Sequence, residues 1–176
     1  MNLPASSIDP TEAIRNHTPC WWVIHTRPRC EKKMDQWFTD RGWDHYLPTR
    51  SKKRSYPGKI VTFQHPLFAG YTFGVFNLLQ RNAVYGSGHA AGILEVVDQA
   101  QLIRELEILK LALAQGHNAQ ECPYLKVGQR TRITLGQLRG LEGIVLRHKD
   151  QTRMIVSVEI LQRSVSWKLT RIGWKQ

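Results

Sequence analysis

The sequence predicts an α+β domain, an α/β sandwich in which helices flank an antiparallel sheet, followed by a small five-stranded β-barrel. Three observations predict this. Compact apolar runs of strand length recur between residues 20 and 97, and apolar side chains are spaced as in a helix at two places. After residue 122 the apolar pattern changes to strict alternation. A chain of 176 residues has room for one or two small domains.

The first strand and the first helix follow each other closely. The apolar run Cys20–Thr26 predicts a strand that is buried on at least one face. A helix is expected to begin near Pro28, because proline is tolerated in a first helical turn, and to end at Gly42. Its apolar positions at helical spacing are Cys30, Met34, Trp37 and Phe38.

The middle of the domain is predicted to consist mainly of strands. Lys52–Pro66 predicts a hairpin, because Tyr56–Lys59 has proline and glycine at the centre of a turn. The segment Gly86–Gly92 is rich in glycine and reads as a flexible loop rather than a phosphate-binding motif. Three further runs predict strands, namely Trp43–Pro48, Phe68–Val75 and Ile93–Val97.

A second helix is predicted over Asp98–Gln115. Asp98 and Gln101 have the spacing of a capping box, and Gly116 ends the helix. One face is marked by Leu102, Leu106, Leu109 and Leu113. This leucine stripe is expected to pack on the sheet of its own domain, with a partner helix as the alternative.

The remaining boundaries follow from composition. Residues 1–19 are polar with three prolines and are expected to be a disordered tail. The first domain then covers residues 20–115, a polar linker covers residues 116–122, and the barrel covers residues 123–176.

Charge is unevenly distributed along the chain. The chain carries 25 basic and 14 acidic residues, and ten of the basic residues fall within Arg27–Lys59 with four acidic ones. Glu121–Gln176 holds eleven basic and four acidic residues. Two basic regions predict two contacts with a polyanion such as nucleic acid, while solubility alone is the other explanation.

Composition also argues against several classes of protein. No apolar run has the roughly 18 residues of a membrane span, and the N-terminus lacks the pattern of a secretory signal, so no membrane association is expected. Three cysteines without paired spacing favour the reducing cytoplasm. The seven histidines show no metal-ligand spacing, and no catalytic constellation is found. We therefore expect no enzyme activity, no metal and no cofactor.

Over about residues 20–173 the chain resembles the NusG family of transcription elongation and antitermination factors. The first domain matches the family's NGN domain through the motifs WWVIHTRPRCEKKM, YLPTR and HPLFAGYTFGVF. The second domain is similar to the family's KOW barrel through VGQRTRITLGQLRGLEGIV and MIVSVEILQRSVSWKL. The segments VVDQAQLIRELEILKLAL and PYLKVGQR resemble specialised paralogues that serve particular operons.

The resemblance implies a function. The NGN domain is expected to bind the clamp helices of the β′ subunit of RNA polymerase and to reduce pausing or termination. Such an accessory factor is expected to act as a monomer. The resemblance assigns the polymerase contact to the aromatic side chains of Trp21, Phe68 and Tyr71. A place in the core is the alternative for each of them.

Two groups of cations are implied to contact nucleic acid, either exposed non-template DNA or nascent RNA. The first group, at the start of the first helix, is Arg27, Arg29, Lys32 and Lys33, for which a solvated helix face is the alternative. The second group, near the tip of the hairpin, is Lys52, Lys53, Arg54 and Lys59.

The KOW domain is implied to recruit a further factor. In the family the partner is the termination factor Rho or the ribosomal protein NusE. The matching surface comprises Leu138, Leu141, Ile160, Leu161 and Gln162, which we expect to be exposed. Arginines in this domain keep open a second interpretation, in which the protein is an RNA-binding or ribosome-associated KOW protein that does not act on polymerase.

Overall fold

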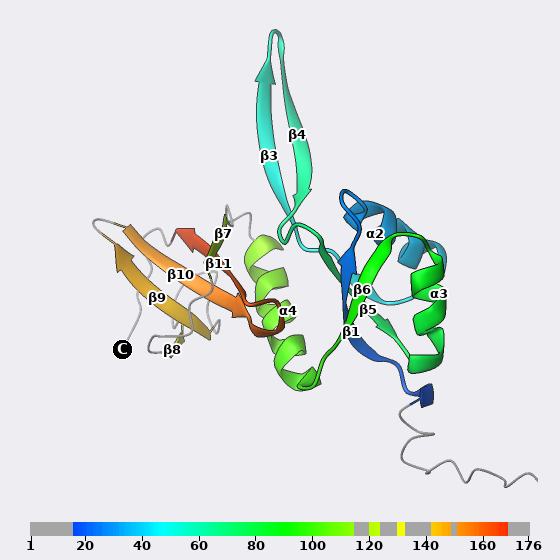
Figure 1. Ribbon diagram of the computed structural model, residues 1–176. Coiled ribbons are helices and arrows are strands. Elements are labelled where there is room, and N and C mark those ends of the chain that lie inside the picture. Colours follow the sequence, from blue (N-terminus) through cyan, green and yellow to red (C-terminus); the bar gives the residue numbers. More distant parts are fainter. Residues whose placement is uncertain (1–15, 115–119, 124–129, 133–141, 149–150, 169–176) are drawn as a thin grey trace, which may run out of the picture. The chain divides into compact units, whose positions relative to one another are not determined.

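The computed structural model describes residues 16–114, 120–123, 130–132, 142–148 and 151–168 (Figure 1). The chain divides into two compact units. The first unit comprises Met1–Tyr46 and Gly70–Glu95, and the second comprises Leu47–Ala69 and Val96–Gln176.

The first unit is built on a four-stranded antiparallel sheet with the strand order β2-β5-β1-β6. Its strands are β1 (Cys20–Thr26), β2 (His45–Tyr46), β5 (Tyr71–Phe76) and β6 (Ala90–Glu95). Its helices are α2 (Glu31–Asp40) and α3 (Arg81–Gly86), and a short 3-10 turn, η1 (Leu78–Gln80), precedes α3. The expected α+β architecture with an antiparallel sheet and helices is confirmed.

The core of the first unit lies on one face of the sheet, beneath α2 and α3. Alternate residues of β1 point to opposite faces, so Trp22 and Ile24 share this face. The cluster consists of Trp22, Ile24, Met34, Phe38, Phe76, Val84, Ala90 and Ile93. Gly74 on β5 lets α2 approach closely, because an added Cβ there would lie 2.5 Å from the Phe38 ring.

Hydrogen bonds and helix-end geometry stabilise the elements around this core. The indole Nε1 of Trp22 donates a hydrogen bond to the Phe76 carbonyl at 2.8 Å, and the two rings stack with centroids 5.5 Å apart. Asn77 and Gln80 form a reciprocal capping box at the start of η1. Gly42, with φ +64°, follows α2 at the position where a helix commonly ends on a left-handed residue.

The second unit contains the hairpin, one helix and the C-terminal strands. The hairpin, β3 (Thr49–Tyr56) with β4 (Lys59–Pro66), is a two-stranded sheet of its own. The helix α4 (Gln99–Ala114) buries Leu102, Leu106 and Leu109, three of the four residues of the expected leucine stripe. The C-terminal strands β7 (Gln120–Pro123), β8 (Arg130–Arg132), β9 (Glu142–His148), β10 (Gln151–Val158) and β11 (Arg163–Lys168) form one sheet.

This five-stranded antiparallel sheet has the order β7-β11-β10-β9-β8, and the turn η2 (Glu159–Leu161) joins β10 to β11. Its closure into a KOW barrel stays a prediction. The strand β7 begins at Gln120, inside the segment predicted as a linker, because it pairs with Arg163–Ser166 of β11. The predicted tail, residues 1–19, lies outside the described residues up to residue 15.

Other differences from the expected elements are local. The helix α3 was not predicted, because its six residues are too few to show a helical period. The strand β6 begins at Ala90, within the predicted glycine-rich loop, and ends at Glu95. None of the helices in the described ranges is long and apolar enough to cross a membrane.

Candidate functional site

The hairpin is the most cationic described segment of the second unit. Pro57 and Gly58 form its turn, and Gly58 has φ +79°, as the third residue of a type II turn requires. The strands pair without a register shift from Thr49 opposite Pro66 to Tyr56 opposite Lys59. Every residue from Ser51 to Ile60 is exposed.

This register sorts the hairpin side chains onto two faces, because directly paired residues share a face and neighbours along a strand do not. We call one face the cationic face. It consists of Arg50, Lys52, Arg54 and Tyr56 from β3, with Lys59, Val61, Phe63 and His65 from β4. We call the other the hydroxyl face. It consists of Thr49, Ser51, Lys53 and Ser55 from β3, with Ile60, Thr62, Gln64 and Pro66 from β4.

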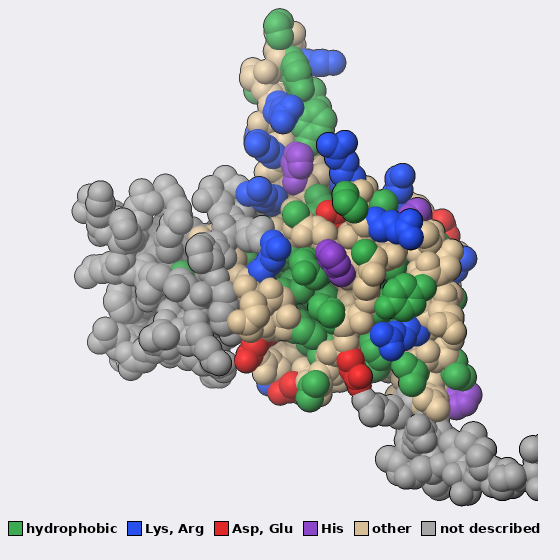
Figure 2. Space-filling model, viewed as in Figure 1, with side chains coloured by type: hydrophobic (Ala, Val, Ile, Leu, Met, Phe, Trp, Pro, Cys, Tyr) green, Lys and Arg blue, Asp and Glu red, His purple; other side chains and the backbone are tan. Residues whose placement is uncertain are grey.

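Side-chain contacts agree with this division. On the hydroxyl face, Gln64 Nε2 donates a hydrogen bond to Ser51 Oγ at 2.8 Å. On the cationic face, the rings of Phe63 and His65 lie with centroids 6.5 Å apart. Figure 2 shows basic side chains along the length of the hairpin, with apolar ones among them and no acidic ones.

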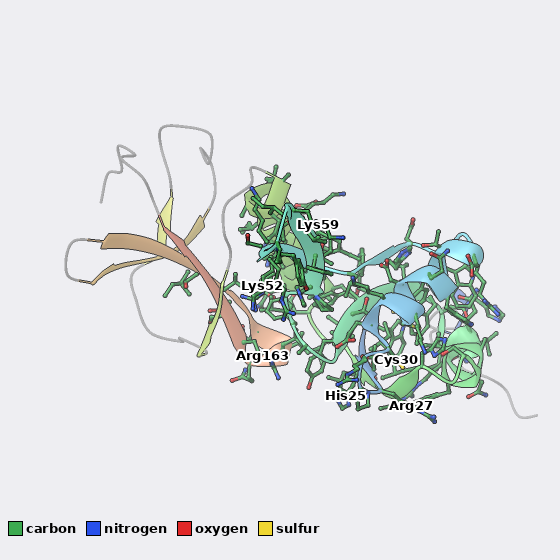
Figure 3. All side chains as sticks on the ribbon, turned by 90° about the horizontal axis from the view of Figure 1, so that it is seen from above. His25, Arg27, Cys30, Lys52, Lys59 and Arg163 are labelled. Atoms are coloured by element: carbon green, nitrogen blue, oxygen red, sulfur yellow. The ribbon has the colours of Figure 1, made fainter. Side chains whose placement is uncertain are left out.

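The start of α2 carries the other group of cations. Arg27, Arg29, Lys32 and Lys33 are all exposed, as expected. Figure 3 shows His25, Arg27 and Cys30 gathered where β1 leads into α2. Arg29 has φ +61°, a left-handed conformation that few residues other than glycine adopt. The connection between β1 and α2 therefore turns tightly, with Arg27 and Arg29 exposed on it and Lys32 and Lys33 exposed on the first turn of α2.

Backbone hydrogen bonds hold this connection in place. The Arg27 amide donates to the His89 carbonyl at 2.8 Å, and the Thr26 amide donates to the Gly70 carbonyl at 2.8 Å. The buried carboxylate of Glu31, in the first turn of α2, accepts the Gly70 amide at 2.8 Å. A carboxylate in this position also interacts favourably with the helix dipole. The four cations are thus presented by a rigid frame.

Two of the expected polymerase contacts share a face of the first sheet. Trp21 pairs with Val75, and His25 pairs with Tyr71, so the register places Trp21 and Tyr71 on the face opposite the helix-covered core. Both are partly exposed. The ring of His25 lies 5.1 Å from that of Tyr71, between centroids. We call this the second face of the sheet, defined by Trp21, Val23, His25, Tyr71, Phe73, Val75 and Leu94.

Phe68 is placed differently. It is completely buried, with 0% of the side chain exposed. Its neighbour Leu67, also buried, donates its amide to the Pro48 carbonyl at 2.8 Å. The expectation of an exposed ring is therefore corrected for Phe68, which takes the alternative role of a core aromatic. A contact with polymerase stays a prediction for Trp21 and Tyr71.

The expected partner surface of the C-terminal domain is only partly described. Leu138 and Leu141 lie outside the described residues. Leu161 is buried, with 8% exposed, which corrects the expectation that it points to solvent. Ile160 is partly exposed, and Gln162 is exposed with φ +49° at the end of η2. Exposure at this turn therefore rests on Ile160 and Gln162.

Sequence reasoning missed three aromatic residues near the cations. Tyr56 and Phe63 lie on the cationic face, and His25 lies beside Tyr71. The alternation of Lys52, Arg54 and Tyr56 carried the signal for the hairpin, because residues two apart on a strand share a face. A count of charges along the segment does not show that Lys52 and Lys53 lie on opposite faces of the hairpin.

The described residues hold no group of three or more histidine, cysteine, aspartate or glutamate side chains that could bind a metal ion. What they do provide is exposed cations and partly exposed aromatic rings, which bind by charge and contact area.

Comparison with known proteins assigns the family. The family model described as "Transcription termination factor nusG" matches residues 19–112, which is more than half of the chain. No curated protein matches the chain. The matched range begins just before β1 and ends within α4, so it contains both cationic groups and the second face of the sheet. This chain belongs to the NusG family of transcription factors.

Proposed function

We propose that the protein is a transcription elongation and antitermination factor of the cytoplasm that binds RNA polymerase and nearby nucleic acid. The observation that carries this proposal is the family match over residues 19–112, the range that contains the second face and both cationic groups. The segments that resemble specialised paralogues support a role at particular operons.

The polymerase contact is proposed for Trp21 and Tyr71 on the second face of the first sheet, because Val23 and Phe73 on the same face are fully buried. Trp21 and Tyr71 are both partly exposed there, and aromatic side chains bury a large area with few rotatable bonds. The partner is the pair of clamp helices of the β′ subunit. By holding the clamp closed, the protein reduces pausing and termination.

The nucleic-acid contact is proposed for the four cations at the start of α2 and for Lys52, Arg54 and Lys59 on the cationic face of the hairpin. Guanidinium and ammonium groups attract phosphates. Binding releases the counterions condensed on the nucleic acid, and because this release is less favourable at high salt, the affinity falls as salt rises. The candidates are exposed non-template DNA and nascent RNA. The C-terminal domain, as a KOW barrel, recruits a further factor such as Rho or NusE.

The experiment is a binding measurement with the full-length chain. Bacterial RNA polymerase is compared with polymerase whose β′ clamp helices are deleted, and we expect the deletion to abolish binding. Tyr71→Ala should weaken binding by roughly tenfold or more, as truncation of an interface aromatic does. Binding that survives the deletion would overturn the polymerase assignment.

A matched control separates contact from stability. Tyr85 on α3 is 40% exposed and lies outside the second face, so Tyr85→Ala should leave polymerase affinity unchanged. Thermal unfolding of both variants checks that each is folded. In a transcription assay, the wild-type protein should shorten pauses, and Tyr71→Ala should shorten them less.

A further inference from the structure

The two faces of the hairpin differ in charge. The cationic face carries four of the five cations of the hairpin, and the hydroxyl face carries only Lys53. The sequence between Thr49 and Pro66 contains no carboxylate. A carboxylate opposite a cation on the neighbouring strand would stabilise a sheet, but here Lys52 lies opposite Phe63. The positive charge of this face is therefore not neutralised within the hairpin.

The same face presents aromatic rings to solvent. Tyr56 is 42% exposed and Phe63 is 38% exposed. In the described part of the chain, the cation–π contacts are made by Arg41 and Arg81, and none is made by a cation of the hairpin. The ring faces are thus not occupied by the neighbouring cations.

The spacing of these groups suits a single strand of nucleic acid. Residues two apart on a strand lie about 6.6–6.8 Å apart, so Arg50, Lys52 and Arg54 form a regular row. Lys59 adds a cation from the opposite strand, where Phe63 supplies a ring (Lys52 and Lys59 are labelled in Figure 3). A single strand offers a row of phosphates together with bases whose faces can stack on aromatic side chains.

A duplex fits this face less well. A two-stranded ribbon can enter a major groove, but it reads base edges there with hydrogen-bonding side chains. Bases inside a duplex keep their faces covered by their neighbours, so Tyr56 and Phe63 could not stack on them. An acidic protein would match the cations but would leave the rings without a role.

We propose that the cationic face of the β3–β4 hairpin binds single-stranded nucleic acid, with the cations on phosphates and with Tyr56 and Phe63 stacking on bases. This inference deepens the proposed function and rests on it for the setting, since a transcribing polymerase exposes both single-stranded DNA and RNA. The hydroxyl face takes no part in binding.

The test uses the full-length chain and fluorescence anisotropy with three probes, which are a labelled single-stranded oligothymidine, its oligouridine counterpart and a blunt DNA duplex. We expect both single strands to bind more tightly than the duplex. The single strand that binds more tightly shows whether the ligand is DNA or RNA, and a preference for either one supports the proposal. A duplex that binds as tightly as both strands would overturn it.

Two pairs of variants separate the faces. Lys52→Gln and Lys53→Gln remove the same charge from adjacent positions on opposite faces. Only Lys52→Gln should lower affinity, and it should reduce the slope of log affinity against log salt by about 0.7. Phe63→Ala and Ile60→Ala each truncate an exposed apolar side chain, on the cationic and the hydroxyl face respectively. Only Phe63→Ala should weaken binding, by roughly tenfold.

Equal losses for the two lysine variants, with no loss for Phe63→Ala, would overturn the proposal in favour of unspecific charge attraction. The polymerase measurement distinguishes this failure from that of the proposed function. All four variants should keep wild-type polymerase affinity through the second face, and circular dichroism should show that they are folded. A protein that binds polymerase but no single strand refutes only the hairpin inference.

Discussion

The β1–β5 pair and the β3–β4 hairpin have the same backbone ladder and opposite surroundings. Both are antiparallel pairs of regular register. In the first, Val23 lies opposite Phe73, and both side chains have 0% exposure. In the hairpin, Lys52 lies opposite Phe63, and the ring is 38% exposed. The backbone pairing alone therefore does not determine function, because the burial of each cross-strand pair decides whether its side chains stabilise the fold or can contact a partner.

The largest expected difference comes from truncating one phenylalanine that packs against β5 and one that lies on the hairpin. Phe38→Ala removes a ring with 0% exposure from the core, and we expect a loss of about 3–5 kcal/mol in the free energy of unfolding. Phe63→Ala on the hairpin should change that free energy by less than about 0.5 kcal/mol. Urea unfolding of both variants measures the values. Comparable losses would show that the hairpin ring is part of a packed core.

Two glycines extend the comparison. An added Cβ at Gly74 would lie 2.5 Å from the Phe38 ring, so Gly74→Ala should cost about 1–3 kcal/mol by overpacking the core. At Gly58 a Cβ meets nothing within 4 Å, but the residue has φ +79°. Gly58→Ala should therefore cost about 1 kcal/mol through backbone strain alone.

Two different measurements distinguish overpacking of the core from backbone strain in the turn. Thermal unfolding should report the cost of Gly74→Ala, whereas single-strand binding should be more sensitive to Gly58→Ala, because the turn sets the register of the hairpin. A Gly74→Ala variant as stable as the wild type would contradict the close approach of α2 to the sheet.

Hydrogen bonds provide a third comparison. Trp22 is 4% exposed, and its Nε1 donates to the Phe76 carbonyl at 2.8 Å. Trp22→Phe should cost roughly 1–2 kcal/mol, because the buried carbonyl loses this donor. Ser51→Ala removes the exposed acceptor of Gln64 Nε2 and should cost less than about 0.5 kcal/mol. Chemical denaturation of the two variants gives the difference, and a reversed order would contradict the burial that separates them.

The smallest expected effect is a pH dependence. Burial raises the pKa of Asp35 above 3.8, and the charge of His45, 3.3 Å away, opposes this rise. Between 3.8 and the raised pKa, the folded protein binds more protons than the unfolded chain, so stability falls as the pH rises through this window. The effect is small because the Asp35 side chain is 39% exposed.

Asp35→Asn should remove this decline, which urea unfolding at a series of pH values below and above 3.8 would measure. The hairpin contains no carboxylate, so Phe63→Ala should keep the wild-type pH profile. An unchanged decline in the Asp35→Asn variant would assign it to another group.

Local pattern predicted much of the fold. The first strand was predicted over Cys20–Thr26, with the bounds that β1 has, because its apolar run is short and bounded by polar residues. The hairpin turn at Tyr56–Lys59 follows from the proline and glycine at its centre. The helix predicted over Asp98–Gln115 corresponds to α4, Gln99–Ala114. It was predictable because helical periodicity over a long segment is the most reliable signal of secondary structure.

Among the site residues, the exposed cations were predictable and the aromatic residues were not. Charged side chains such as Arg27, Lys32 and Lys52 almost always lie at the surface, so their exposure follows from residue type. Aromatic side chains occur both in protein cores and at interfaces, so residue type does not predict their exposure. Phe68 is buried, for example, whereas Tyr71, three residues later, is partly exposed.

By itself, the amino-acid sequence determined the strand β1, the hairpin turn, the helix α4 and the distribution of positive charge, because these depend on neighbouring residues. It also carried the motifs of the NusG family. Only the tertiary structure decided the strand order β2-β5-β1-β6, the burial of Phe68 and Leu161, and the pairing of Gln120–Pro123 with β11. These depend on contacts between residues far apart in the chain, which local periodicity does not specify.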